Sequence, residues 1–383
     1  MKTLYTKSKF HIQQAIKRGV RVEAHIADIH FGSIDPKVQY DILNEQFLQK
    51  IYKLKLDLVS INGDLFDHKF MSNSDVVMYA MEFVDNLVRY CRSTGCTLIL
   101  LHGTMSHDAN QLKLFYRYLN DPSVDIRIIE EARFEDVKDK KILCIPEMYN
   151  RGAEYYNTLL YDNGYFDGCV LHGTIAGSIY GKEQEDLNSD REPVFSIRNF
   201  VMCKGPIVCG HVHVAQCLKN DIYYTGSPIR DRFGEEQPKG FSILLHDLDT
   251  REYYMHFEEI KSFRYDTVNL DDMLSQDPKK IIEYISKLKD DGIDHIRVIF
   301  TMPSSNIPIV KNYFRTNSNV VIKDDLQSRQ LAARNEIIKE KFEKYSYILD
   351  KNLSPYEILV RYINQNMNES YITTDELMEL LKE

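Results

Sequence analysis

Histidine and aspartate residues recur in this sequence directly after short apolar runs. An apolar run that ends in such residues is typical of a buried strand whose C-terminal end reaches a ligand site. Asp28 and His30 stand two positions apart in HIADIH, so a strand would carry both side chains on one face. The other members of the set follow later apolar runs: Asp64 after LVSIN, Ser106, His107 and Asp108 after TLILL, His172 after GCVL, and His211 and His213 after PIVC.

The side chains in this set suit a pair of divalent metal ions. Within the set, two carboxylates and four imidazoles would converge. Such a mixture matches borderline ions such as Mn, Fe or Zn, whereas Ca²⁺ and Mg²⁺ prefer oxygen ligands alone. Asp64 is able to bridge two ions. Two ions about 3.5–4 Å apart would contact the attacking and the leaving oxygen of a phosphoryl displacement. They would also acidify a shared water, so that no protein base is needed at neutral pH. The residues therefore predict a two-metal phosphoesterase.

The ordered motifs D-x-H, G-D, H-D, an isolated H and G-H-x-H span residues 28 to 213 and resemble the calcineurin-like metallophosphoesterase superfamily. The resemblance implies a four-layer α-β-β-α sandwich. It also implies two sets of metal ligands, namely Asp28, His30, Asp64 and His213 for one ion and Asp64, His172 and His211 for the other. His107 would contact the scissile phosphate and stabilise charge or protonate the leaving oxygen. Asp108 would orient the imidazole of His107.

One segment departs from the superfamily pattern. The superfamily has G-N-H-D, in which the asparagine binds the second metal, whereas this chain reads GTMSHD, with Ser106 at that position and two residues inserted after Gly103. A neutral hydroxyl is a poorer ligand than an amide carbonyl. We therefore expect a second metal site that is weaker or differently built, with biphasic metal dependence and with Thr104 or His102 as other candidate ligands.

A second block narrows the resemblance. YYTGSPIRDRFGEEQPKGFSIL, residues 223 to 244, is similar to the block that follows G-H-x-H in SbcD-type nucleases, the nuclease subunits of SbcCD and MRN-type DNA repair complexes. GDLFD, with Asp67 three positions after Asp64, also looks like that branch, and the GT-x-SHD variant resembles versions from tailed phages. The resemblance implies a Mn-dependent DNA exonuclease and endonuclease that forms a homodimer and binds an SbcC-like ATPase.

Apolar strands that alternate with amphipathic helices predict an α/β fold. Helical spacing is clear over residues 37 to 55 and 74 to 90. We expect a basic N-terminal arm over 1–22, a nuclease domain over 23–256, a small α/β capping domain over 257–322 and a helical C-terminal region over 323–383. Capping boxes at Ser354 and Thr373 begin two helices of that last region. Its apolar stripes would cover the protein's own core or dock on the ATPase.

DNA contacts require cations near the metal ligands. Arg230, Arg232 and Lys239 follow His213 and are the candidates, and Lys138, Lys140 and Lys141 form a further basic cluster. For each of these residues the alternative is a solvated surface position, and for the basic arm it is a packed helix with solvated lysines. The formal net charge of -9 does not indicate a nucleic-acid binder, although bound cations would offset the clustered carboxylates.

Composition restricts the setting of this chemistry. The seven cysteines form no CxxC pair and mostly lie in apolar runs, which indicates buried thiols in a reducing compartment. No run is long enough to span a membrane, so we expect the cytoplasm, or the host cytoplasm for a phage-encoded protein. Two alternatives to the nuclease are a phosphatase or nucleotide phosphodiesterase of the same superfamily, and a catalytically weak DNA-repair scaffold.

Overall fold

The computed structural model describes residues 20–180, 193–219, 221–247, 251–324, 345–349, 353–366 and 373–380. The chain forms two compact units. One comprises Met1–Asp266 with Lys289–His295, and the other comprises Thr267–Leu288 with Ile296–Glu383. Most of the basic arm predicted over 1–22 lies outside the described residues, as does much of the region predicted over 323–383. Arg21, near the end of that arm, already belongs to the first strand.

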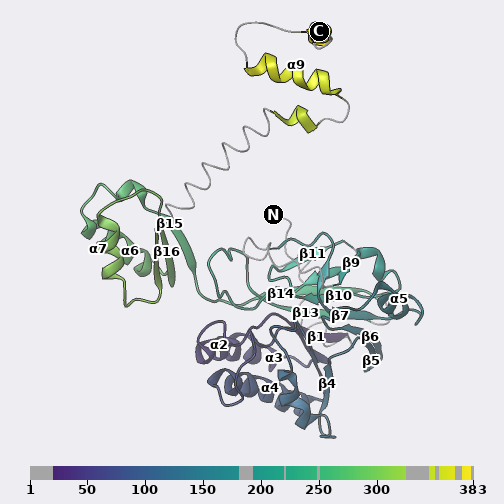
Figure 1. Ribbon diagram of the computed structural model, residues 1–383. Helices are drawn as coiled ribbons and strands as arrows, with labels where there is room; N and C mark the ends of the chain where they lie inside the picture. Colours follow the sequence, from purple (N-terminus) through teal and green to yellow (C-terminus); the bar gives the residue numbers. More distant parts are fainter. Residues whose placement is uncertain are drawn as a thin grey trace. The chain divides into compact units, whose positions relative to one another are not determined.

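The first unit contains a six-stranded sheet with the order β14-β13-β1-β2-β3-β4. Figure 1 labels β14, β13, β1 and β4 of this sheet. Neighbouring strands from β1 to β4 run parallel, and β13 pairs antiparallel with both β1 and β14. The parallel strands are apolar along their length because helices cover them and a second sheet packs against them. The bounds are β1 (Arg21–Ile26), β2 (Leu58–Asn62), β3 (Thr97–Leu101), β4 (Asp125–Ile129), β13 (Gly240–His246) and β14 (Tyr253–Glu259).

A second six-stranded sheet of the same unit has the order β11-β12-β10-β7-β6-β5. Its inner strands run parallel, whereas β5 and β11 pair antiparallel at the two edges. A short parallel pair, β8 (Thr174–Ile175) and β9 (Val194–Phe195), lies outside this sheet. The bounds are β5 (Arg133–Val137), β6 (Lys140–Ile145), β7 (Gly168–His172), β10 (Ile207–Gly210), β11 (Gln216–Leu218) and β12 (Ile222–Tyr224).

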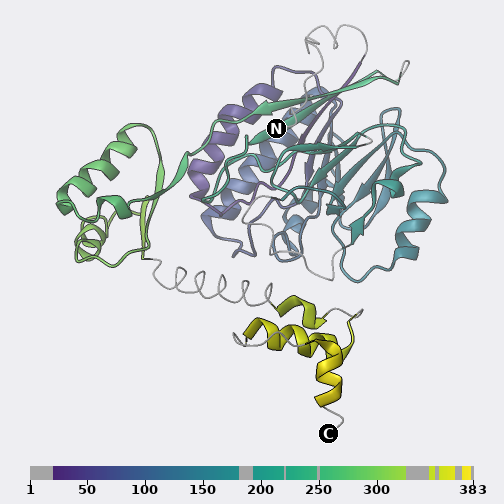
Figure 2. The same cartoon turned by 90° about the horizontal axis from the view of Figure 1, so that it is seen from above.

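Helices cover one side of the first sheet. The helix predicted over 74–90 is confirmed as α4 (Asp75–Thr94), which begins at the N-cap Ser74 and ends at Gly95 with φ 71°. The helix predicted over 37–55 is confirmed as a continuous helical segment of α2, a π-helical turn and α3 over residues 36–51. Their buried apolar residues form one cluster with those of β1, β2 and β3. Helix α5 (Ala153–Tyr161) packs instead with residues of the second sheet (Figure 2).

The two sheets pack against each other through a shared apolar cluster. Leu58, Ile99 and Leu101 of the first sheet meet Ile142 and Val170 of the second. This arrangement brings the C-terminal ends of parallel strands from both sheets into the same region of the unit, which is where the candidate site lies.

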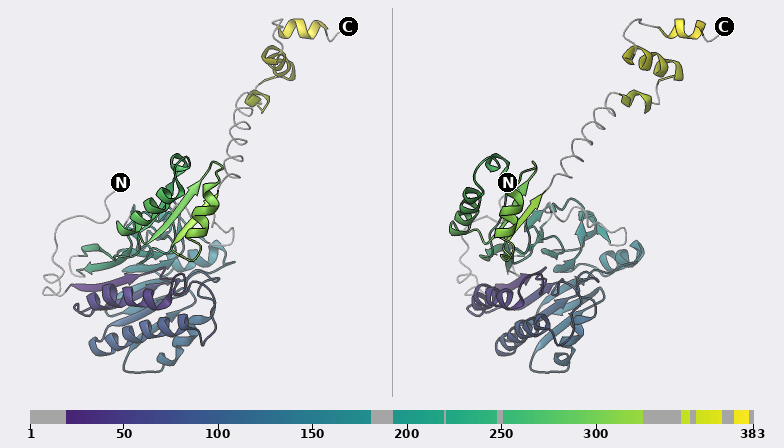
Figure 3. Two further views of the ribbon diagram at one scale, coloured as in Figure 1. Left: turned by 90° about the vertical axis from the view of Figure 1, so that its left-hand side faces the viewer. Right: turned by 60° about the vertical axis from the view of Figure 1, so that its left-hand side comes forward.

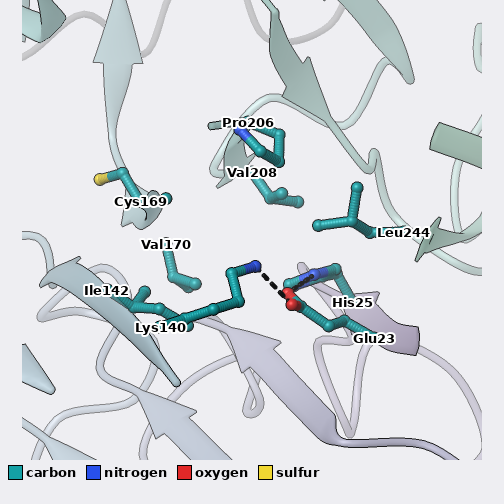
Figure 4. A pocket seen from close by; sticks show the side chains of 10 residues that line it. Glu23, His25, Lys140, Ile142, Cys169, Val170, Pro206, Val208 and Leu244 are labelled. Carbon is teal, nitrogen blue, oxygen red and sulfur yellow. Dashed lines mark hydrogen bonds and ion pairs between the residues drawn. The ribbon is translucent and has the colours of Figure 1, made fainter. Parts of the chain in front are cut away.

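A buried ion pair also lies between the sheets (Figure 4). Lys140 Nζ donates a hydrogen bond to Glu23 Oε1, and both side chains are only 4% exposed. His25 extends this polar group, with Nε2 3.4 Å from Glu23 Oε2 and Nδ1 2.6 Å from Ser60 Oγ. The prediction that Lys140 belongs to a basic surface cluster is wrong. Lys140 is buried because it forms an ion pair with Glu23, which lies 117 positions earlier on a strand of the other sheet.

The second unit is built on a three-stranded sheet with the order β15-β16-β17. These strands are β15 (Tyr265–Asn269), β16 (His295–Phe300) and β17 (Val320–Asp324). Helices α6 (Pro278–Asp290) and α7 (Asn306–Tyr313) lie on the same face of this sheet (Figure 3). Helix α6 precedes β16, and α7 precedes β17, so helices and strands alternate over this region.

Short helices follow toward the C-terminus. Helix α9 (Pro355–Asn366) begins with the predicted capping box, in which Glu357 N–H donates to Ser354 Oγ and Ser354 N–H donates to Glu357 Oε2. Thr373 and Glu376 form the same reciprocal bonds before α10 (Thr374–Leu380). Within the described part of the chain, no helix is both long and apolar enough to cross a membrane.

Candidate metal centre

Three adjacent parallel strands of the first sheet each end just before a polar residue of the candidate site. Asp28 follows β1, Asp64 follows β2 and Thr104 follows β3. Hydrogen bonds tie the first two loops together, because Asp28 N–H donates to Gly63 O at 3.1 Å and His30 N–H donates to Asp64 O at 3.0 Å. The register of the sheet therefore fixes the separation of the Asp28 and Asp64 side chains.

The second sheet supplies the opposite side of the site in the same manner. Glu147 follows β6, His172 ends β7 and His211 follows β10, and these three strands are neighbours in the sheet. All three run parallel, so their C-terminal ends lie at one edge. Two sets of strand ends thus face one another, as expected for ligand sites in parallel sheets.

The loops hold several candidate ligands in a strained backbone conformation. Asp28, His30 and Asp64 have φ values of 51°, 50° and 52°, and His211 has 88°. A left-handed non-glycine residue costs about 1–3 kcal/mol, and such residues concentrate at functional sites. Strand β1 ends at Ile26, before both residues, so the prediction that a strand carries Asp28 and His30 on one face is wrong. The left-handed turns, rather than strand alternation, direct both side chains into the site.

Two glycines permit the close approach of the loops. A Cβ atom on Gly63 would lie 2.1 Å from His172 Nδ1, and one on Gly103 would lie 2.2 Å from Asp64 Oδ1. Gly63 also has a φ of 90°, which an L side chain rarely adopts. Any larger residue at these positions would push apart the groups that must converge.

Four overlapping groups of side chains have ligand atoms close enough to hold a metal ion. They are Asp28, His30 and His213; His30, Asp64 and His107; Asp28, Asp64 and His172; and Glu147, His172 and His211. Asp64 joins the groups, since its Oδ2 lies 3.7 Å from His30 Nε2 and 3.3 Å from His172 Nε2. The structure thus brings together all six of the Asp and His residues that the sequence proposes as metal ligands.

Glu147 is a member of this centre that sequence reasoning missed. It is 2% exposed, and its Oε2 lies 3.2 Å from His211 Nδ1, 3.7 Å from His172 Nε2 and 3.1 Å from Thr104 Oγ1. Its signal in the sequence is its place two residues after the apolar run KILCI, where the other ligands also follow strands. A lone glutamate after a strand is usually a solvated residue, so its position alone is weak evidence for a metal ligand.

The structure places Ser106 away from the centre. Ser106 is exposed, whereas Thr104 is buried and its backbone N–H donates to Asp64 Oδ1 at 2.6 Å. His102 is a poor candidate as well, because its Nδ1 and Nε2 lie 2.8 Å and 2.6 Å from the carbonyl oxygens of Gly103 and Ala109. The two inserted residues therefore carry Ser106 outward, and Thr104 is the hydroxyl that faces the carboxylates.

The donor set fits metal ions by an independent criterion. Asp28 Oδ2, His30 Nδ1 and Glu147 Oε1 are buried and make no hydrogen bond to any residue that the structure describes. A buried polar atom without a partner costs free energy, and a buried carboxylate costs more. Divalent cations would compensate the carboxylates and coordinate their unused oxygens. The residues present therefore fit a metal centre.

The carboxylates and imidazoles shift one another's protonation. Burial opposes ionisation of Asp64, but the imidazole of His172 outweighs burial and lowers the Asp64 pKa well below its ordinary value. Burial disfavours the imidazolium of His172, yet Asp64 raises the His172 pKa well above its ordinary value. Burial likewise lowers the His211 pKa, but a hydrogen bond with Glu147 raises it overall. A binding cation must displace the protons that these pairs retain.

His107 and Asp108 do not contact each other in the way that the superfamily resemblance implies. Asp108 does not orient the imidazole of His107. Its carboxylate instead accepts hydrogen bonds from three backbone N–H groups, those of Gly103 at 2.8 Å, Asp64 at 3.1 Å and Phe66 at 3.1 Å. His107 Nδ1 faces the carbonyl oxygen of Asp67. Asp108 therefore anchors the loops that carry Asp64 and Thr104, and Asp67 orients His107.

The lysine and arginine side chains expected to contact DNA form hydrogen bonds within the protein. Lys239 is 2% exposed, and its Nζ donates to Ser227 Oγ at 2.6 Å and to Glu235 Oε1. Arg230 donates from Nε to Glu235 O at 3.0 Å, and Arg232 donates to both carboxylate oxygens of Asp231 at 2.8 Å and 3.1 Å. The expectation of a DNA contact is wrong for buried Lys239. The two arginines are half-buried and hold their own loop.

Comparison with known proteins gives a coarse functional class. No family model matches the chain. "Putative phosphoesterase 078R" of Invertebrate iridescent virus 3 is 24% identical over 287 residues, which cover 68% of this chain and 68% of that protein. "Putative phosphoesterase 244L" of Invertebrate iridescent virus 6 is 24% identical over 271 residues, which cover 67% and 89%. With the clusters of ligands, these relatives support a phosphoester hydrolase of a metallophosphoesterase-like family.

A solved structure, the crystal structure of Pseudomonas putida nuclease MPE, aligns with 58% of this chain and 84% of its own at 11% identity. Its TM-score of 0.26 is too low to support an argument from that likeness.

Proposed function

We propose that this chain hydrolyses DNA phosphodiester bonds with two Mn²⁺ ions, as the nuclease subunit of an SbcCD-like repair or recombination complex. The observation that carries the chemistry is the position of Asp64, whose Oδ2 lies 3.7 Å from His30 Nε2 and 3.3 Å from His172 Nε2. A carboxylate between two sets of imidazoles is suited to bridge two cations. Two cations held in this way stabilise the transition state of phosphoryl transfer, which is the reaction that such a cluster of ligands favours most.

The ligands divide into two positions that share Asp64. By the resemblance, the first position would comprise Asp28, His30, His213 and Asp64, and the second would comprise Asp64, His172 and His211. In support, Asp28, His30 and His213 form one group of close ligand atoms, and His172 and His211 share another with Glu147. When bound, the two ions supply charge stabilisation to the phosphate and lower the pKa of water. The surrounding protein keeps these side chains in place through the carboxylate of Asp108, which accepts the backbone N–H groups of Asp64 and Gly103.

His107 is the group proposed to handle the leaving oxygen. Because the Asp67 carbonyl can only accept, Nδ1 of His107 carries the proton and Nε2 is left for the substrate. In hydrolysis, a bond forms between the water oxygen and phosphorus as the bond from phosphorus to the sugar oxygen breaks. In its imidazolium form, His107 would donate its Nε2 proton to that sugar oxygen and keep the Nδ1 proton. The proton released by the attacking water balances the one that is donated. Such general-acid assistance contributes about 10²- to 10⁴-fold in rate.

The choice of DNA rests on the block over residues 223 to 244 and its resemblance to SbcD-type nucleases. In support, this block supplies the surroundings of a metal ligand, since Lys239 Nζ donates to His213 O at 3.4 Å and Glu235 Oε1 lies 3.9 Å from His213 Nδ1. The proposal includes the four-layer sandwich, a capping domain over 257–322 and a C-terminal region that docks on an SbcC-like ATPase. It also includes a homodimer.

One set of assays tests the function. Purified full-length protein is incubated with Mn²⁺ and linear duplex DNA, single-stranded DNA, or p-nitrophenyl phosphate mono- and diesters. The same assays are run on His107→Ala and, as a matched control from the same loop, Ser106→Ala. We expect cleavage of DNA by the wild type and by Ser106→Ala, and loss of cleavage in His107→Ala.

Other results would contradict the proposal in distinct ways. Turnover of the esters without cleavage of any DNA identifies a phosphatase or nucleotide phosphodiesterase. Absence of all turnover by a protein that binds Mn²⁺ identifies a scaffold.

A further inference from the structure

We propose that Glu147 is a ligand of the second metal ion and takes the place of the neutral amide ligand that the superfamily pattern has there. This inference rests on the two-ion centre of the proposed function and specifies how its second position is built. Ser106, which aligns with that amide in the sequence, is exposed and has no part in the position.

The geometry around Glu147 supports a ligand more than a structural ion pair. Its Oε2 lies 3.2 Å from His211 Nδ1 and 3.7 Å from His172 Nε2, the two imidazoles of the second position. Its Oε1 is buried and makes no hydrogen bond within the described ranges of the chain. A structural glutamate with a 0% exposed side chain would be expected to satisfy both oxygens. The unused oxygen indicates a cation.

Thr104 positions this carboxylate relative to the shared one. Its hydroxyl lies 3.1 Å from Glu147 Oε2 and 3.2 Å from Asp64 Oδ2, and its backbone N–H donates to Asp64 Oδ1 at 2.6 Å. Two carboxylates this close repel each other unless a positive charge lies between or beside them. The insertion after Gly103 and the presence of Glu147 therefore compensate each other. The insertion removes the amide ligand from the site, and Glu147 supplies a carboxylate in its place.

With Glu147 in place of the amide ligand, the two proposed metal positions have the same kinds of ligand. Each proposed position would have two imidazoles, a carboxylate and a share of Asp64, because Asp28 groups with His30 and His213 and Glu147 groups with His172 and His211. A carboxylate binds a divalent cation more strongly than a neutral amide or hydroxyl does. Of the two alternatives that the sequence left open, a weaker or a differently built second position, this inference therefore favours the second, with both ions bound at similar affinity.

Calorimetric titration of the metal-free full chain with Mn²⁺, with bound ions counted by electron paramagnetic resonance, tests this inference. The variants are Glu147→Gln, which restores an amide of nearly the same shape, Asp28→Asn, the double variant, and Ser106→Ala as control. We expect two ions with similar affinity in the wild type and in Ser106→Ala. Each single variant keeps one ion and binds the other at least about 10-fold more weakly. The double variant binds neither ion tightly.

Two outcomes would overturn the proposal: an unchanged two-ion isotherm for Glu147→Gln, or loss of an ion in Ser106→Ala. If Glu147→Gln does not fold, as judged by circular dichroism, Glu147→Asp takes its place, because a shortened carboxylate must also weaken one ion. The titration is independent of the DNA assays. A protein that binds two ions through Glu147 but cuts no DNA refutes only the proposed substrate. One that cuts DNA with an unaltered Glu147→Gln titration refutes only this inference.

Discussion

Asp64, which follows a strand of the first sheet, lies with its Oδ2 3.3 Å from Nε2 of His172, which ends a strand of the second sheet. The contact joins the two sheets at the place where their parallel strands end. His172 is fixed from its other side, since Nδ1 lies 2.7 Å from the carbonyl oxygen of Asn62, the last residue of β2. The relative position of the sheets thus sets the separation of the two metal positions.

His107 is expected to be dispensable for metal binding but required for hydrolysis. Its Nδ1 is held by the Asp67 carbonyl, and its ring centroid lies 4.6 Å from that of His30. His107→Ala should reduce cleavage about 10²- to 10⁴-fold, as for loss of a general acid. Calorimetry with Mn²⁺ should still count two ions. Loss of an ion in this variant would show that His107 is a ligand, as the cluster of His30, Asp64 and His107 also permits.

Asp108 should matter for stability and for the placement of Asp64. Replacement by alanine leaves three buried N–H donors, those of Asp64, Phe66 and Gly103, without their acceptor. Each such loss costs about 1–3 kcal/mol, so Asp108→Ala should lower the free energy of unfolding by about 3 kcal/mol or more. Asp108→Asn keeps one acceptor oxygen and should lose less. Urea unfolding of the metal-free proteins measures both, and equal stability of Asp108→Ala and wild type would contradict the anchoring role.

The ion pair between the sheets should make stability depend on pH in the acid range. Burial opposes ionisation of Glu23, but the ammonium of Lys140 outweighs burial and lowers the Glu23 pKa to about 2 from 4.5. The folded pKa is the lower one, so the stabilisation is complete above about pH 4.5. It is lost as the pH falls toward 2, and the shift corresponds to about 3 kcal/mol.

Substitutions at this pair separate its two effects. Glu23→Gln leaves the Lys140 ammonium buried without its partner, which should cost about 3–5 kcal/mol at neutral pH. The double variant Glu23→Gln with Lys140→Met should recover most of that loss. Its unfolding free energy should also fall less than that of the wild type between pH 5 and pH 3. Wild-type acid sensitivity in the double variant would exclude Glu23 as its source.

Lys239 should contribute to the metal centre rather than to DNA contact. Its ammonium is buried against Ser227 and Glu235, and Glu235 lies beside His213. Lys239→Met should therefore destabilise the fold and weaken Mn²⁺ binding. The dependence of DNA affinity on salt should stay unchanged, whereas a lost phosphate contact would reduce its slope by about 0.9. Fluorescence anisotropy at several salt concentrations, with the wild type as control, distinguishes the two roles.

Much of the centre was predictable because strand periodicity survives in the sequence. Apolar runs that end in Asp or His indicate six candidate ligands, and parallel strands bring such ends together. The left-handed turns at Asp28 and His30 carry no comparable signal, since neither residue type requires that conformation. The sequence therefore indicates residues that do lie close together, although left-handed turns and not strand alternation direct the side chains of Asp28 and His30.

The errors arose where a side chain depends on a partner far away in the sequence. Glu147 resembles any glutamate after a strand until His172 and His211 are placed beside it. Lys140 looked like a surface lysine because its partner Glu23 lies on the other sheet. Ser106 aligned with the expected ligand, but alignment could not show that the inserted residues carry it outward. The errors at Glu147 and Lys140 reflect tertiary pairing that the local sequence pattern does not contain, whereas the error at Ser106 reflects a local insertion.

A crystal structure of the full chain grown with Mn²⁺, with diffraction collected at the manganese absorption edge, tests the central claim most directly. The account predicts two anomalous peaks about 3.5–4 Å apart. One should be bound by Asp28, His30 and His213 and the other by Glu147, His172 and His211, with Asp64 in contact with both. A single peak, or manganese bound away from Asp64, would contradict the two-metal centre.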